Sequence, residues 1–229
     1  MNKSANSIHA AQLAELEKNL RIGISVEEFI RQIETEFLSD LTRNEEDIAN
    51  FREWKGAYRN WKKEIIPIYY FLKHENGFVC LTYTNQQHPD FSLTNTNGEV
   101  FLIEVTTVFA RADVESAKIL NDKGYFVGDC LVRDNLPQSD FMNALTRARG
   151  GLLSKNVLAC VEAIHNALNI KERKLNGVNY LVIYMPSVLT INENEFREQV
   201  LPEIECTSIS CEQIYIVSEN FSIGLKHEQ

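Results

Sequence analysis

The chain has 229 residues, of which 44% are apolar and 24% charged, and its formal net charge is −9. This composition is ordinary for a globular protein and excludes a disordered, fibrous or low-complexity chain. The negative charge disfavours attraction of the whole molecule to a polyanion, so a nucleic-acid partner would need a local basic face. No apolar run approaches the ~20 residues that span a bilayer, so we expect no membrane partner.

Two further features predict a cytoplasmic location. The first 25 residues are interrupted by charged side chains and have no apolar stretch of the kind that defines a signal peptide. The five cysteines are an odd number without the spacing of a disulfide framework, which favours a reducing compartment.

The first 75 residues predict helices, because apolar side chains recur there at intervals of three and four. The spacing of Ser25 and Glu28 is that of a capping box, which begins the second helix. The third helix is expected to begin after Asn44 and to present two parallel rows. An aromatic row consists of Phe51, Trp54, Tyr58 and Trp61, and a basic row of Arg52, Lys55, Arg59 and Lys62.

Each of these rows has a functional and a structural interpretation. The aromatic row could stack on bases, but we favour packing in the core. The basic row could follow the phosphates of a nucleic acid, with Arg59 as a substrate-binding residue, although a solvated helix face explains it as well.

Beyond residue 75 the pattern predicts short strands separated by helices. The Asn97-Gly98 turn is typical of a hairpin, since both residues tolerate positive φ. A long helical region is expected to begin at residue 139 and a shorter helix at residue 193. Strands are expected at residues 78–83, 91–94, 99–109, 179–185 and 213–218.

The resulting order is helix, three strands, helix, strand. A helix between two strands introduces parallel pairing into a sheet that otherwise consists of hairpins. We therefore expect an α/β fold with a mixed central sheet and an N-terminal helical extension. The corresponding division is a helical region at residues 1–62 and an α/β core at residues 63–229.

Two acidic residues stand out in the predicted hairpin. Glu104 interrupts an apolar strand, where a buried carboxylate is costly unless it is paired, protonated or bound to a metal. Because Asp90 and Glu104 lie at nearly equal distances from the turn, the hairpin should bring them together. Two neighbouring carboxylates suit a hard divalent ion such as Mg²⁺. The alternative is that Asp90 begins a turn and Glu104 pairs with a basic side chain.

The alternation of a strand assigns the neighbours of Glu104 to two faces. Leu102, Glu104 and Thr106 should share one face, and Ile103 and Val105 the other.

Pro89-Asp90, thirteen intervening residues and then Glu104-Val105-Thr106 resemble the motif of the PD-(D/E)XK, or restriction-endonuclease-like, nuclease superfamily. The resemblance extends over about half of the chain. It implies an αβββαβ core in which the motif occupies the second and third strands.

The resemblance also implies an activity, which is hydrolysis of DNA phosphodiesters with Mg²⁺ or Mn²⁺. Asp90 and Glu104 would hold the ion, together with the backbone carbonyl of Val105. Glu64 would match the acidic residue that some members have before the first strand, although Glu53 or Glu75 could take that place. Duplex cutting often uses two sites, which favours a homodimer.

One residue departs from the motif, because Thr106 stands where the family has lysine and its hydroxyl has no positive charge. Some members move the basic group to the following helix. Lys155, Arg147 and Arg149 are the candidates here, since residues 143–176 contain six basic and two acidic side chains. We expect Thr106 and Lys155 to act in catalysis and the two arginines to bind substrate. A surface position for Lys155 is the structural alternative.

Three alternatives stay open at this stage. Loss of the lysine is compatible with a catalytically silent binding or assembly module. The helical first third of the chain could instead dock a partner or a second copy. His88, next to Pro89-Asp90, is either a proton carrier or partner of the site or an ordinary turn residue.

Overall fold

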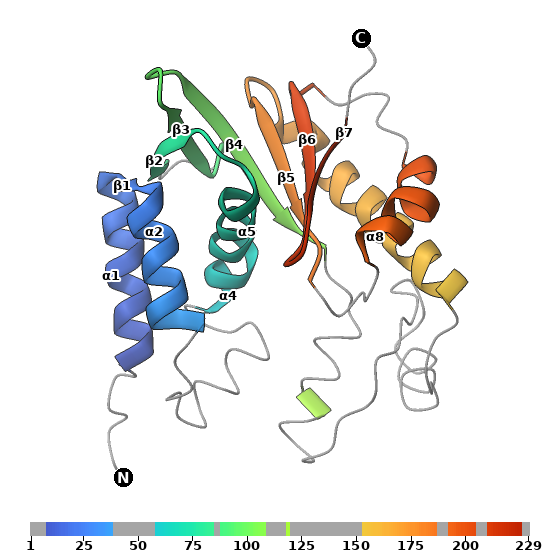
Figure 1. Ribbon diagram of the computed structural model, residues 1–229, viewed down its shortest axis with the longest axis horizontal. Helices are drawn as coiled ribbons and strands as arrows, with labels where there is room; N and C mark the ends of the chain where they lie inside the picture. Colours follow the sequence, from blue (N-terminus) through green and yellow to red (C-terminus); the bar gives the residue numbers. More distant parts are fainter. Residues whose placement is uncertain are drawn as a thin grey trace.

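A computed structural model describes residues 8–38, 58–84, 88–108, 118–119, 153–186, 192–204 and 210–225. Its centre is a seven-stranded mixed sheet in which the strands lie in chain order (Figure 1). The strands are β1 (Ile24–Ser25), β2 (Phe78–Tyr83), β3 (Phe91–Asn95), β4 (Val100–Thr107), β5 (Tyr180–Tyr184), β6 (Gln213–Val217) and β7 (Ser222–Leu225). The expected α/β class with a mixed sheet is therefore confirmed.

The direction of pairing changes where a helix joins two strands. Strands β1 to β4 pair in antiparallel fashion, as do β6 and β7. Strands β4 and β5 are parallel, and α8 (Leu153–Lys171) lies between them in the chain. Strands β5 and β6 are also parallel. Among the described residues, the order from α5 (Ile66–His74) to β5 is helix, three strands, a long helix and strand, which is the order that the sequence predicts.

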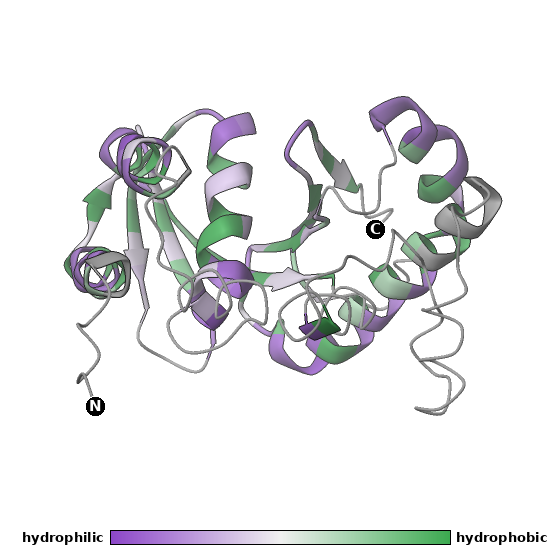
Figure 2. Ribbon diagram, turned by 90° about the horizontal axis from the view of Figure 1, so that it is seen from below, coloured by the Kyte–Doolittle hydropathy of each residue, from purple (hydrophilic) through white to green (hydrophobic). Residues whose placement is uncertain are grey.

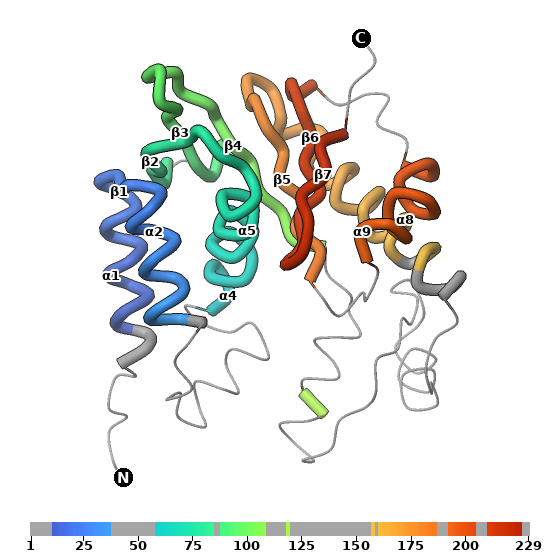
Figure 3. Tube along the Cα trace, viewed as in Figure 1, coloured from blue at the N-terminus to red at the C-terminus, as the bar shows by residue number. Residues whose placement is uncertain are grey.

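Helices cover both faces of the sheet. One group stands to the left in Figure 1, and α8 lies to the right of β5, β6 and β7. The first group comprises α1 (Ile8–Ile22), α2 (Val26–Gln32), η1 (Ile33–Leu38), α4 (Tyr58–Asn60), η2 (Trp61–Ile65) and α5. The second comprises α8, η3 (Glu172–Lys174), α9 (Glu193–Glu195), η5 (Phe196–Val200) and η6 (Leu201–Glu203). Of the second group, η5 packs against α8, and Figure 3 labels α9, which η5 continues, on the same side of the sheet as α8.

Alternation along the strands divides the apolar side chains into two cores. Ile103 and Val105 of β4 pack with the first group of helices, whereas Leu181 and Ile183 of β5 pack with the second. The view from below shows many apolar residues, coloured green, along the strands (Figure 2). Glu104 lies on the opposite face of β4 from Ile103 and Val105, as the alternation predicts, and the structure shows that this face is toward α8.

The predicted start of the second helix is confirmed. The hydroxyl of Ser25 accepts a hydrogen bond from the backbone N–H of Glu28 at 3.1 Å, which satisfies one of the free donors of α2. The Glu28 carboxylate bonds with Arg31 and Gln32.

The aromatic row is packed in the core as far as the structure describes it. Tyr58 and Trp61 are buried, and the Trp61 ring lies 4.6 Å from that of Phe37. The other two members of that row, and Arg52 and Lys55 of the basic row, lie outside the described residues. No helix within the described ranges is both long enough and apolar enough to cross a membrane.

Candidate functional site

Strand register brings the two predicted acids together. Phe91 of β3 pairs with Ile103 of β4, so Asp90, one residue before β3, stands opposite Glu104. Directly opposed residues of antiparallel strands have neighbouring side chains. The predicted convergence of Asp90 and Glu104 is therefore observed.

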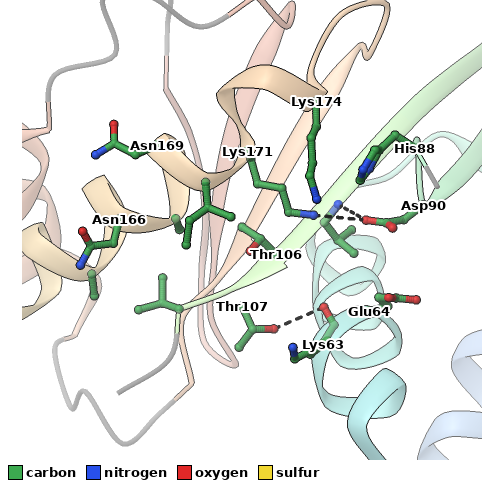
Figure 4. Close-up of a pocket in the computed structure, with 15 residues that line it drawn as sticks. Lys63, Glu64, His88, Asp90, Thr106, Thr107, Asn166, Asn169, Lys171 and Lys174 are labelled. Carbon is green, nitrogen blue, oxygen red and sulfur yellow. Dashed lines mark hydrogen bonds and ion pairs between the residues drawn. The ribbon is translucent and has the colours of Figure 1, made fainter. Parts of the chain in front are cut away.

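A lysine from α8 lies between these carboxylates. The ammonium group of Lys171, the last residue of α8, contacts Glu104 Oε1 and lies 3.8 Å from Asp90 Oδ2. Figure 4 shows this lysine extending from the end of α8 toward Asp90. Its side chain is 13% exposed, and that of Glu104 is completely buried. The alternative expectation that Glu104 pairs with a basic side chain is thus also met.

Two further contacts fix the orientation of the acids. The backbone N–H of Val105 donates to Asp90 Oδ2 at 2.9 Å. His88 Nδ1 lies 3.0 and 3.2 Å from the two oxygens of Glu104. Each carboxylate is therefore held by hydrogen bonds in addition to the shared lysine, which limits the positions it can adopt.

Lys171 alone does not balance the charges of the two acids. Burial, reinforced by the negative charge of Glu104, raises the pKa of Asp90 to about 7, although Lys171 and the Val105 N–H oppose the shift. When both acids are ionised, two negative charges face one ammonium group. The cluster of the two acids and Lys171 then carries an excess of negative charge, which an additional cation would neutralise.

A cavity of about 800 Å³ adjoins the cluster between η2, the end of β4 and α8. Lys63, Glu64, Asp90, Thr106, Lys171 and Lys174 are among the residues that line it (Figure 4). Glu104, which is completely buried, is not one of the described residues that line this cavity.

The wall of the cavity opposite α8 is tied to the sheet. The Thr107 hydroxyl donates to the backbone carbonyl of Lys62 at 3.0 Å, which attaches the end of β4 to η2. The Tyr83 hydroxyl donates to the Glu64 carboxylate at 2.5 Å. Burial and the charge of Arg59 lower the pKa of Lys63. Lysines and acids therefore alternate around the cavity, with Lys63 beside Glu64 on η2 and Lys171 beside Asp90.

Three other predicted site residues lie at or next to the cavity. Thr106 and Glu64 line the cavity, and Val105 contributes its backbone N–H to Asp90. Arg59 is exposed on α4.

The basic residues that were predicted on the helix after β4 lie mainly outside the residues that the structure describes. Lys155 belongs to α8, but its side chain lies outside the described residues. Arg147 and Arg149 lie outside them altogether. Glu53, the alternative to Glu64, does so too, whereas Glu75 accepts a hydrogen bond from Ser222.

Sequence reasoning did not identify Lys171, although it placed the basic group on the helix after β4. The spacing of apolar residues along α8 could have identified Lys171 as a residue that faces the sheet. Ile164 and Leu168 are buried, and Lys171 follows them at intervals of seven and three residues. A lysine in line with buried positions of a helix needs an acidic partner, and the buried Glu104 is that partner.

The two carboxylates are the type of ligand that a hard divalent ion prefers, but they are only two. Among the described residues, no group of three or more His, Cys, Asp or Glu side chains is arranged to hold a metal. Mg²⁺ typically uses one or two carboxylates and retains several waters. Asp90 and Glu104 offer such a pair, and the ammonium group of Lys171 already takes the position of a cation between them.

Comparison with protein-family models, with curated proteins and with solved structures finds no match to this chain. Any functional assignment must therefore depend on the geometry of the site.

Proposed function

We propose that the protein is a metal-dependent phosphodiester hydrolase, a DNA endonuclease of the PD-(D/E)XK type, in which Asp90 and Glu104 hold Mg²⁺ or Mn²⁺. The main support is the position of Asp90 opposite Glu104, as the strand register extends, beside a cavity and with Lys171 between the two acids. The order from α5 to β5 also agrees with the αβββαβ core that the sequence motif implies.

A bound divalent ion would lower the pKa of a coordinated water and neutralise charge on the phosphodiester. Asp90 and Glu104 would supply oxygen ligands, with the backbone carbonyl of Val105 and the carboxylate of Glu64 as further candidates. The Val105 N–H and His88 hold the two acids in place. Lys171 provides the positive charge that Thr106 cannot, from the helix instead of the strand.

The lysines that line the cavity support a nucleic-acid substrate. Lys63, Lys171 and Lys174 line the same cavity as Asp90. A phosphodiester is the anion that these cations would attract, while the net charge of −9 keeps the rest of the surface unfavourable for it. Cleavage of both strands of a duplex would require two such sites, so a homodimer belongs to the same proposal.

Substitution of either acid tests this function. Asp90→Asn and Glu104→Gln should each reduce Mn²⁺-dependent nicking of supercoiled DNA by at least about a hundredfold, because each removes a charged ligand. Circular dichroism should show an intact fold. Glu99→Gln is the matched control, since Glu99 is an exposed carboxylate in the turn of the same hairpin and should leave nicking unchanged. Nicking at the wild-type rate in either acid variant would exclude this site.

A catalytically silent binding module is the second candidate. It is favoured by the position of Lys171, which fills the space between the acids, and by the complete burial of Glu104. Calorimetric titration with Mn²⁺ separates the two functions. A silent module would give no binding heat, whereas a hydrolase would give heat that disappears in Glu104→Gln.

A further inference from the structure

The position of Lys171 has a consequence for any divalent ion at this site. Its ammonium group contacts Glu104 and lies 3.8 Å from Asp90, so it occupies the volume between the two carboxylates. Mg²⁺ must approach its ligand oxygens to about 2.0–2.1 Å. An ion shared by both acids therefore needs the volume in which the ammonium group lies.

Charge repulsion reinforces this steric conflict. Lys171 and a divalent ion together would bring three positive charges to two carboxylates, and their repulsion is strong where water is excluded. Lys171 and His88 both contact Glu104 and both line the cavity, whereas Glu104 itself is completely buried. Asp90 already lines the cavity, so an ion that bridges both acids requires Lys171 to move away from Glu104.

We infer that Lys171 holds the acid pair together in the metal-free protein and is displaced from it when a divalent ion binds. This inference rests on the proposed function. Lys171 is thus an internal competitor of the metal ion. Because α8 ends at this residue and its side chain lies on the cavity wall, the displaced ammonium group remains within the cavity that receives the substrate phosphate. The same residue would then lower metal affinity and promote cleavage.

Calorimetry with Mn²⁺ alone, on the full-length chain, tests the exchange. Lys171→Met should bind Mn²⁺ at least about tenfold more tightly than the wild type, because the ion no longer displaces a paired ammonium group. Lys171→Arg should restore the weaker binding. Lys174→Met is the matched control, because Lys174 lines the same cavity three residues further along. It should tighten binding by no more than about threefold through its general electrostatic effect.

Cleavage at saturating Mn²⁺ provides the second measurement. Lys171→Met should cleave more slowly than the wild type although it binds the ion more tightly. A lysine with a merely structural role would not produce these opposite changes. If Lys171→Met is unstable without metal, its melting temperature should rise more on addition of Mn²⁺ than that of the wild type. Lys171→Gln, which keeps a polar side chain, would then be used for the titration.

The outcomes distinguish the inference from the function on which it rests. Equal tightening in Lys171→Met and Lys174→Met would overturn the exchange, and the ion would then bind beside Lys171, for example at Asp90 and Glu64. The proposed function would survive that result if Glu104→Gln abolished cleavage. An absence of Mn²⁺ binding in the wild type and in Lys171→Met alike would remove both.

Discussion

Asp90 is the residue whose charge most clearly conflicts with its surroundings. It is largely buried opposite Glu104, and its pKa is raised because burial and that neighbour disfavour the ionised form. Lys171 can neutralise one of the two acids but not both. A residue of this kind lowers the stability of the metal-free protein, and such costs are common at functional sites.

Asp90→Asn should therefore stabilise the metal-free protein while it removes activity. The asparagine oxygen can still accept the Val105 N–H, and Lys171 can pair fully with Glu104. We expect a gain of roughly 1 kcal/mol, which corresponds to an increase in melting temperature of about 2–4 °C for a chain of this size. Thermal denaturation above neutral pH, with a chelator present, measures it. A lower melting temperature than that of the wild type would show that the Asp90 charge is well compensated.

The acid pair and its lysine differ in how far sequence alone can predict them. Asp90 and Glu104 are related by one hairpin, so the position of Asn97-Gly98 and the two-residue period of a strand fix their approach. Lys171 lies 67 residues after Glu104, and its contact depends on the rotation and placement of α8 against the sheet. The rotation and placement of α8 arise from packing between distant segments. The helical period predicts which face of α8 is buried, but not which residues of the sheet that face contacts.

At the scale of elements, Asn179 joins three neighbouring strands next to the site. Its side-chain oxygen accepts the N–H of Leu102 at 2.7 Å, and its amide nitrogen donates to Glu212 at 2.7 Å. Its backbone N–H donates to the carbonyl of Leu102 at 2.9 Å. Asn179 therefore attaches the start of β5 to β4 at Leu102, which lies two residues before Glu104.

Asn179→Ala should destabilise the protein by about 1–3 kcal/mol, because the Leu102 N–H loses its acceptor within a partly buried region. Urea denaturation would show this as a lower midpoint with an unchanged slope. The matched control is Asn176→Ala in the exposed turn before β5, which should change stability by less than about 0.5 kcal/mol. Equal effects of the two substitutions would mean that the strand junction does not depend on the Asn179 side chain.

The strands that the sequence did not predict are those with weak local patterns. Gly224 interrupts β7, and glycine weakens a strand signal because it has no side chain to pack. Strand β1 has two residues and exists through its pairing with Cys80 and Leu81, which are far away in the chain. By contrast, β5 and β6 are continuous apolar runs, typical of strands that are covered on both faces, and were predicted.

For the whole molecule, the central feature is that the N-terminal helices and the sheet share a hydrophobic core. Leu20 of α1 and Phe29 of α2 are completely buried, in one cluster with Val105 of β4 and Val182 of β5. The division expected between residues 62 and 63 falls within η2, and β1 adds an N-terminal strand to the sheet. These contacts predict that the N-terminal region and the sheet unfold together.

Removal of residues 1–38 should therefore prevent folding of the remaining chain, because it exposes the apolar surface that α1, α2 and η1 cover. Circular dichroism of the shortened chain should lack a cooperative thermal transition. In the full-length protein, the fluorescence of its two tryptophans should change in step with circular dichroism, since Trp61 contacts Phe37 of η1. A shortened chain with a cooperative transition would instead show that residues 39–229 fold on their own and that α1, α2 and η1 are an appended unit. Separate transitions for the two probes in the full-length protein would likewise show that the N-terminal region unfolds independently of the sheet.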